Sequence, residues 1–126
     1  MIDAYICTPY SHPDPAVRCQ RFTEVNRFAV RLVAAGLVIY SPITHSHPLA
    51  LAGELPLDWA FWQRYDREFI AMSRMVIVLK QDGWEKSVGV RAELALARRL
   101  NMPIFYWRPA WREEELEKLI KAIKGA

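Results

Sequence analysis

The segment SVGVRAELALA, residues 87–97, follows the apolar run MVIVL at residues 75–79 and a polar loop. A short apolar run bounded by polar residues is typical of a buried strand, and the spacing after Ser87 is helical. The segment therefore predicts strand, loop and helix, with the Ser87 hydroxyl capping the first turn. The helix dipole and the free N–H groups at such a start favour an anion. Gly89 has no side chain, so a ligand can approach the backbone there.

Glu93 interrupts the apolar face of this predicted helix. On a helical wheel it lies inside the arc formed by Val90, Leu94, Leu96, Ala97 and Leu100. A carboxylate on such a face costs free energy unless it is paired or lines a cavity. Gly89, four residues earlier, points the same way. Three interpretations stay open: a buried structural ion pair, a side chain that reaches out at the edge of the arc, or a reactive group that is reached past Gly89.

Predicted strands and helices alternate along the whole chain. Alternation of this kind favours a parallel sheet with right-handed crossovers. We therefore predict one domain over residues 1–126, a three-layer flavodoxin-like or Rossmann-like α/β fold with a mainly parallel sheet of four or five strands. Residues 43–57 are expected to form a long loop, which in a compact domain is usually functional or mobile. The predicted strands are 4–7, 37–40, 75–79 and 102–107, and the predicted helices are 15–35, closed by Gly36, then 58–73 after the Asp58 cap, 87–97 and 111–124.

A second acid, Asp66, lies on the apolar arc of the predicted helix 58–73, together with Trp59, Trp62, Phe69 and Ile70. Taken alone, it fits a hydrogen-bonded buried aspartate as well as a site residue. Ligands of open parallel sheets bind beyond the carboxyl ends of the strands. The loops after the predicted strands and both acids converge on that edge, which favours a site.

Composition excludes several classes of function. A formal charge of +3, with 52% hydrophobic and 25% charged residues, suits a globular protein that binds a small anion, and no basic run indicates a nucleic-acid polymer. No apolar run is long enough to span a membrane and no leader sequence is evident, so we expect a cytoplasmic protein.

Cys7 and Cys19 lack metal or redox spacing. His45 and His47 lack a third metal ligand, so we expect a polar lid over the substrate, and neither a metal nor a cofactor.

Two carboxylates in one apolar pocket can divide the roles of ionised nucleophile and proton donor. A carboxylate nucleophile suits attack on an anomeric carbon, which gives a covalent glycosyl intermediate. A phenol, from Tyr5 or Tyr10, could orient the nucleophile, and Trp84 is the better candidate for stacking on a base, because helical spacing favours the core for Trp59 and Trp62. These features indicate cleavage of a glycosidic bond in a nucleotide-sized molecule.

Three motifs resemble the nucleoside 2-deoxyribosyltransferase superfamily: Tyr5-Ile6-Cys7, Asp66 eight residues before Arg74, and Ser87-x-Gly89-Val90-x-x-Glu93-Leu94. The resemblance implies that Glu93 is the nucleophile, that Asp66 is catalytic and that Tyr5 orients Glu93. Ser87 is similar to the serine with which the 2′-deoxynucleoside 5′-phosphate N-hydrolases of this superfamily contact phosphate. Arg74 departs from the aspartate that is common there. The loop at 41–48 and the Gly83-Trp84 turn resemble a small bacterial branch without an assigned function, the DUF1937-like domains.

The predicted function is that of an N-glycosidase or deoxyribosyltransferase acting on a nucleoside or its 5′-monophosphate. The alternative is a non-catalytic nucleotide-binding or sensory domain. Aromatic residues on the predicted helices (Phe61, Trp62, Tyr65 and Trp111) and the superfamily resemblance favour a homodimer or higher homo-oligomer. The predicted catalytic residues are Glu93, Asp66 and Tyr5, and the predicted substrate-binding residues are Ser87, Gly89, Tyr10, Ser11, His45, His47 and Trp84.

Overall fold

The computed structural model describes residues 1–126, whose four strands form a single sheet in the order β2-β1-β3-β4. All neighbouring strands are parallel, which confirms the predicted α/β fold, and the strand order follows the flavodoxin-like pattern. Tyr5 lies opposite Val76, and Val76 lies opposite Ile104. The strands are β1 (Ala4–Cys7), β2 (Ile39–Tyr40), β3 (Val76–Leu79) and β4 (Ile104–Trp107).

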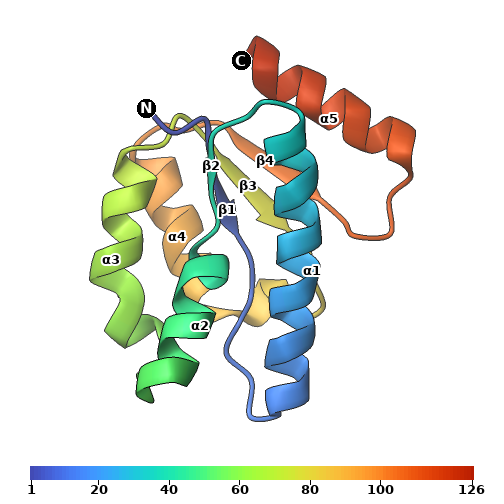
Figure 1. The fold of residues 1–126 in the computed structure, drawn as a ribbon. Coiled ribbons are helices and arrows are strands. Elements are labelled where there is room, and N and C mark those ends of the chain that lie inside the picture. The colour runs from blue at the N-terminus through green and yellow to red at the C-terminus, as the bar shows by residue number, and fades with distance from the viewer.

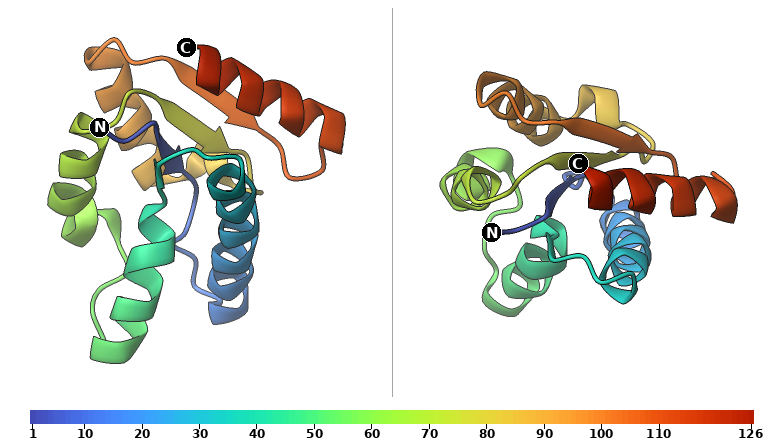
Figure 2. Two further views of the ribbon diagram at one scale, coloured as in Figure 1. Left: turned by 45° about the horizontal axis from the view of Figure 1, so that its top comes forward. Right: turned by 90° about the horizontal axis from the view of Figure 1, so that it is seen from above.

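Helices cover both faces of the sheet. Helices α1 and α5 lie on one face and α3 and α4 on the other, which gives three layers (Figure 2). Helix α2 lies between α1 and α3, at the end of the molecule where the strands finish (Figure 1). None of the five helices is long and apolar enough to cross a membrane. Their bounds are α1 (Pro15–Ala34), α2 (Pro42–Gly53), α3 (Trp59–Ala71), α4 (Val88–Arg99) and α5 (Glu113–Gly125).

The alternation of side chains along β1 divides the core into two clusters. Successive residues of a strand point to opposite faces of the sheet. Ala4 and Ile6 pack in the cluster beneath α1 and α5, and Tyr5 and Cys7 pack in the cluster beneath α3 and α4. All four residues are fully buried. The central strand therefore presents a phenol and a thiol, two residues apart, to the helices that carry the predicted acids.

The boundaries of the helices and strands largely agree with those predicted from the sequence. Ser87 caps α4, because its Oγ accepts a hydrogen bond from the Val90 N–H at 3.2 Å. Gly36 follows α1 with φ of 89°, a left-handed conformation that favours glycine. The second strand comprises only Ile39–Tyr40, shorter than the predicted 37–40.

The prediction of a loop over residues 43–57 is wrong, because Pro42–Gly53 forms helix α2. Pro42 occupies the first turn, where its missing N–H has no intrahelical partner to lose. This helix could not be recognised from periodicity because it has no clear apolar stripe. Polar Ser46 and His47 are buried on it, and apolar Leu51 is 65% exposed.

Candidate active site

A pocket of about 420 Å³ opens at the carboxyl edge of the sheet, enclosed by residues of α2, α3 and the start of α4. In open parallel sheets, ligands bind where the strand order switches direction. Here the switch lies between β1 and β3, because the chain leaves β1 for α1 on one face and β3 for α4 on the other. The pocket brings together residues from four segments of the chain. They are Thr8, Tyr10, Ser11, Pro42, Ile43, Ser46, Leu57, Asp58, Trp59, Ala60, Trp62, Asp66, Lys86, Ser87, Val88, Gly89 and Glu93.

Glu93 reaches this pocket from the buried face of α4 and is only 4% exposed. Both oxygens of its carboxyl group accept hydrogen bonds from β1: the Tyr5 hydroxyl donates to Oε2, and the Cys7 thiol donates to Oε1 at 3.1 Å. No Lys, Arg or His side chain forms a salt bridge with Glu93. The interpretation of Glu93 as half of a structural ion pair is therefore excluded.

Asp66 reaches the same pocket from α3 and is 7% exposed. It lies on the buried side of the helix with Ile70, as the apolar arc predicts. Asp66 is absent from the salt bridges of the chain, and burial alone raises the pKa of its carboxyl group to about 7. A protonated aspartic acid near neutral pH can donate a proton to a ligand in the pocket.

The two acids form a coupled pair. Burial first, and then the charge of Asp66, raise the pKa of Glu93 to about 8, while the hydrogen bonds from Tyr5 and Cys7 oppose the rise. Carboxyl groups that repel each other lose their protons in two steps that belong to the pair. The pair therefore holds one proton near neutral pH. The higher pKa belongs to Glu93, so in the empty pocket this proton resides mainly on Glu93, and the reactive arrangement, with the charge on Glu93 and the proton on Asp66, requires its transfer to Asp66.

The start of α4 forms one end of the pocket and presents several donors. The backbone N–H groups of Val88 and Gly89 have no partner in the chain. The N–H of Val90 is not free, because it donates to the Oγ of the Ser87 cap, and this leaves the Ser87 hydroxyl proton available. Lys86 is the one basic residue in the lining. This end is therefore suited to an anion.

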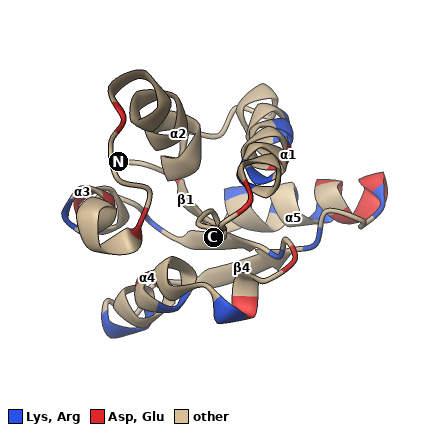
Figure 3. Cartoon of the chain, turned by 90° about the horizontal axis from the view of Figure 1, so that it is seen from below, with Lys and Arg blue, Asp and Glu red and all other residues tan.

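The arginines of α4 do not contribute to the pocket. Arg91, Arg98 and Arg99 are exposed, and Figure 3 shows basic residues on the outer side of α4, away from the sheet. The positive character of the pocket therefore depends on Lys86 and on the helix terminus.

The aromatic wall of the pocket differs from the prediction. Trp59 and Trp62, for which helical spacing favoured the core, both line the pocket. A methyl group added to Gly89 would lie 3.8 Å from Trp59 Cε3, so the indole lies against the open face of this glycine. Trp84, the predicted stacking residue, is not in the lining. Its ring packs against Tyr106 of β4, with the Lys80 ammonium over it.

Neither predicted lid histidine lines the pocket. His47 is buried in α2, where its Nδ1 is hydrogen-bonded to the Tyr10 hydroxyl and its ring stacks on Phe22. His45 Nε2 is hydrogen-bonded to the Tyr65 hydroxyl at 2.8 Å. The two imidazoles therefore fix the position of α2 against α1 and α3. Of the two phenols proposed to orient the nucleophile, Tyr10 is thus engaged elsewhere and Tyr5 contacts Glu93.

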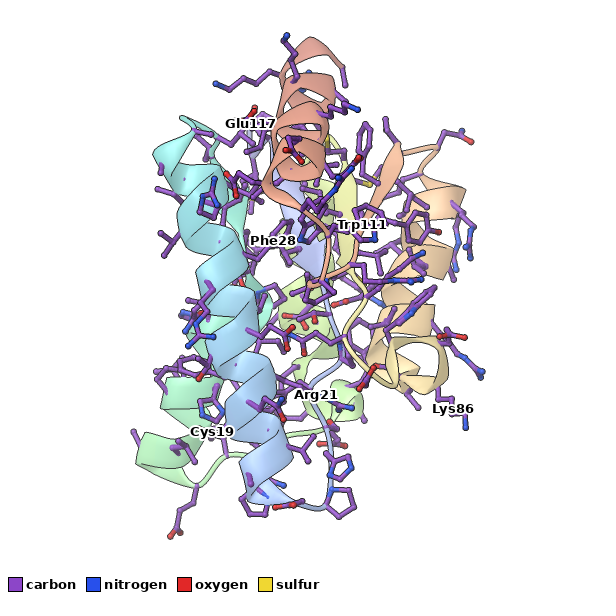
Figure 4. The ribbon with its side chains drawn as sticks, turned by 90° about the vertical axis from the view of Figure 1, so that its right-hand side faces the viewer. Cys19, Arg21, Phe28, Lys86, Trp111 and Glu117 are labelled. Atoms are coloured by element: carbon purple, nitrogen blue, oxygen red, sulfur yellow. The ribbon has the colours of Figure 1, made fainter.

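Arg21 of α1 ties together two loops at the edge of the pocket. Its guanidinium donates to the carbonyl oxygens of Tyr10 at 3.3 Å, Ser11 at 3.1 Å and Asp82 at 2.9 Å. Figure 4 shows this side chain between α1 and the loop after β3. Ser11 lines the pocket, and its hydroxyl donates to the Leu57 carbonyl at 2.9 Å, which joins the first loop to the start of α3.

Two residues of the pocket lining, Lys86 and Asp58, and one contact of Glu93, Cys7, were not among the predicted site residues. Lys86 directly precedes the Ser87 cap. Asp58 was assigned only as a helix cap, and it makes no capping hydrogen bond and lines the pocket. Cys7 carried a signal that could have been used, because it lies two residues after Tyr5 and so shares its face of β1.

Residues 3–109 match the family model of a domain of unknown function, DUF1937. The chain belongs to the DUF1937 family. The matched region contains all four strands and every residue of the pocket, and helix α5 follows it. The acid pair is therefore part of the DUF1937 domain itself. None of the curated proteins matches the chain.

Proposed function

We propose that this protein cleaves the N-glycosidic bond of a nucleoside or deoxynucleoside 5′-monophosphate, with Glu93 as the nucleophile. One observation carries the proposal: a buried carboxyl group without a cation partner, held on both oxygens by Tyr5 and Cys7, faces a pocket that contains a second buried acid. The motifs that resemble the nucleoside 2-deoxyribosyltransferases support the same reaction.

In the first step a Glu93 oxygen forms a bond with C1′ of the sugar while the bond between C1′ and the base nitrogen breaks. The electron pair of that bond leaves with the base, and the Asp66 proton goes to the base. The raised pKa of Asp66, about 7, keeps this proton available near neutral pH. The product is a glycosyl ester on Glu93, a covalent intermediate typical of carboxylate nucleophiles.

In the second step water, or a second base, attacks C1′ from the opposite side. The Asp66 carboxylate takes a proton from the attacking group, and the electron pair of the C1′–oxygen bond returns to Glu93 as a carboxylate. Water as the acceptor gives a hydrolase and a base gives a transferase. The site is restored in both cases, with one proton on the acid pair.

The shape and polarity of the pocket suit a nucleotide. Its volume of about 420 Å³ lies within the usual range of small-molecule sites, roughly 300–1,000 Å³. Trp59 and Trp62 offer flat apolar surfaces for a base. Lys86, Ser87 and the first N–H groups of α4 offer donors for a phosphate, and Glu93 follows on the next turn of the same helix.

The test is incubation with a panel of nucleosides and their 5′-monophosphates, with the free base measured by chromatography. We expect release from at least one monophosphate. Glu93→Ala should reduce release by several orders of magnitude. Glu117→Ala, at an exposed position on α5, is the matched control and should be fully active. Binding without release from any compound would contradict the proposal and favour a nucleotide-binding or sensory domain.

A further inference from the structure

Cys7 contacts the Glu93 carboxyl group, although the resemblance described above assigns no role to this cysteine. The thiol is fully buried, and its sulfur lies 3.1 Å from Glu93 Oε1 and 3.9 Å from the Val90 carbonyl oxygen. The carboxylate is both the nearer acceptor and the one that can carry a charge. Tyr5 and Cys7 project from the same face of β1, so one strand supplies a donor to each oxygen of Glu93.

The thiol is a donor because it keeps its proton. Burial, and then the charge of Glu93, raise the pKa of Cys7 well above its ordinary value. A thiolate at this position would face a carboxylate with no compensating charge. The S–H group is therefore the form that the site holds, and a buried S–H group makes its hydrogen bond to the nearer oxygen.

Few other groups face Glu93. Tyr5 and Cys7 approach it from β1 and Asp66 from α3, and the same pocket is lined by Lys86 and Asp58. Lys86 is exposed and forms no salt bridge with Glu93. Two neutral donors from β1 are thus the contacts within the chain that stabilise a negative charge on Glu93, and loss of either should change its ionisation.

The geometry points to Cys7 as a positioning residue, whose S–H group holds Glu93 Oε1 and, together with Tyr5, fixes the ionised carboxylate facing the pocket. A carboxylate bound through one oxygen can rotate about its last side-chain bond, and binding through both oxygens prevents this. The effect on catalysis rests on the function proposed above, whereas the hydrogen bond and its effect on Glu93 do not.

The first test observes the thiol directly. The chain has two cysteines, so Cys19→Ser leaves Cys7 as the sole thiol. Cys19, labelled on α1 in Figure 4, is exposed and does not line the pocket. The S–H stretching band of this variant should move to lower frequency as Glu93 ionises with rising pH. The band should stay fixed when Glu93→Gln is added. A band that is unmoved by pH in both proteins would overturn the inference. Cys7 itself is not substituted in this test.

The second test measures the pKa of Glu93 by carbon NMR of its carboxyl group, assigned with Glu93→Gln. Serine and alanine are both smaller than cysteine, so a packing role predicts similar effects for Cys7→Ser and Cys7→Ala. A donor role predicts opposite effects. Cys7→Ala should raise the pKa of Glu93 by about one unit, because a hydrogen bond to the charged form is lost. Cys7→Ser should lower it, because a hydroxyl is the stronger donor.

Equal pKa values in the two variants would reduce Cys7 to a packing residue. If glycosidase activity is present, Cys7→Ala should lower kcat at least tenfold with little change in KM, and Cys7→Ser should restore most of it. If the spectroscopic results hold and no substrate is cleaved, the proposed function fails and the role of Cys7 stands.

Discussion

Replacement of Glu93 by glutamine should make the protein more stable at neutral and alkaline pH. The pKa of Glu93 is about 8 in the folded protein, against an ordinary value of 4.5. The folded state therefore binds this proton more tightly than the unfolded state, and stability falls as pH rises from about 4.5 to about 8. Glutamine carries no charge at any pH, so Glu93→Gln should lack this loss.

The magnitude follows from the two pKa values. The difference between about 8 and 4.5 corresponds to about 5 kcal/mol at 1.36 kcal/mol per pH unit. Most of it, about 3 kcal/mol, develops between pH 5 and pH 8. The amide has one oxygen, so either Tyr5 or Cys7 loses its acceptor, at a cost of about 1–3 kcal/mol at every pH. The variant should therefore be less stable than the wild type by up to about 2 kcal/mol at pH 5, and more stable by about 1–3 kcal/mol at pH 8.

Urea unfolding, followed by tryptophan fluorescence in buffers from pH 5 to pH 8, measures this difference. Glu117→Gln is the matched control, because it removes an exposed carboxylate from α5 and should follow the wild type at each pH. The decisive quantity is the slope of the stability difference with pH, which does not depend on the constant hydrogen-bond cost. Parallel curves for wild type and Glu93→Gln would show that Glu93 ionises in the folded protein as it does in water, and would refute the reasoning.

Three further expectations concern activity and assembly. The rate of base release should peak between about pH 7 and about pH 8, where the acid pair holds one proton. Asp66→Asn should remove one limb of this pH–rate profile. An unchanged profile would show that Asp66 has only a structural role. The kcat/KM for a monophosphate should exceed the kcat/KM for its nucleoside. Ser87→Asp should lower the ratio of these two constants or bring it below one, because the carboxylate places a negative charge against the phosphate. A ratio near one in both proteins would show that Ser87 is only a helix cap. Light scattering at micromolar concentration should show a dimer. Phe61→Glu should weaken this dimer, because Phe61 is 48% exposed on α3. A monomeric wild-type protein would contradict the prediction of a dimer.

The fold and the acid pair could be predicted because each leaves a local mark in the sequence. Met75–Leu79 is apolar without interruption, as expected of a strand that is covered on both faces. Glu93 and Asp66 each break an otherwise apolar helical stripe, so burial could be inferred from periodicity alone. The convergence of the two acids then followed from the rule that the carboxyl ends of parallel strands share one edge.

The aromatic wall and helix α2 could not be predicted in the same way. Trp59 and Trp62 share a helical arc with core residues, and periodicity cannot distinguish a side chain that packs in the core from one that borders a gap in it. Trp84 lies in the loop next to Ser87, yet its ring is directed to Tyr106. In α2 two of the four buried residues, Ser46 and His47, are polar, and the partner of His47, Tyr10, is 37 residues away in the chain.

The energetic cost of the acid pair is itself an argument for function. Glu93 and Asp66 occupy buried positions beside Val90, Leu94 and Ile70, where apolar side chains would stabilise the fold. Each carboxyl group has a pKa raised by burial, so each destabilises the folded state when it is ionised. The total stability of a domain is typically about 5–15 kcal/mol, so a loss of several kcal/mol at neutral pH is a large fraction of it. No ion pair offsets this loss, and hydrogen bonds from β1 offset only part of it at Glu93. Because local departures from the rules of stability are expected where a chain binds or reacts, the cost of the pair supports the proposal that this pocket is a functional site.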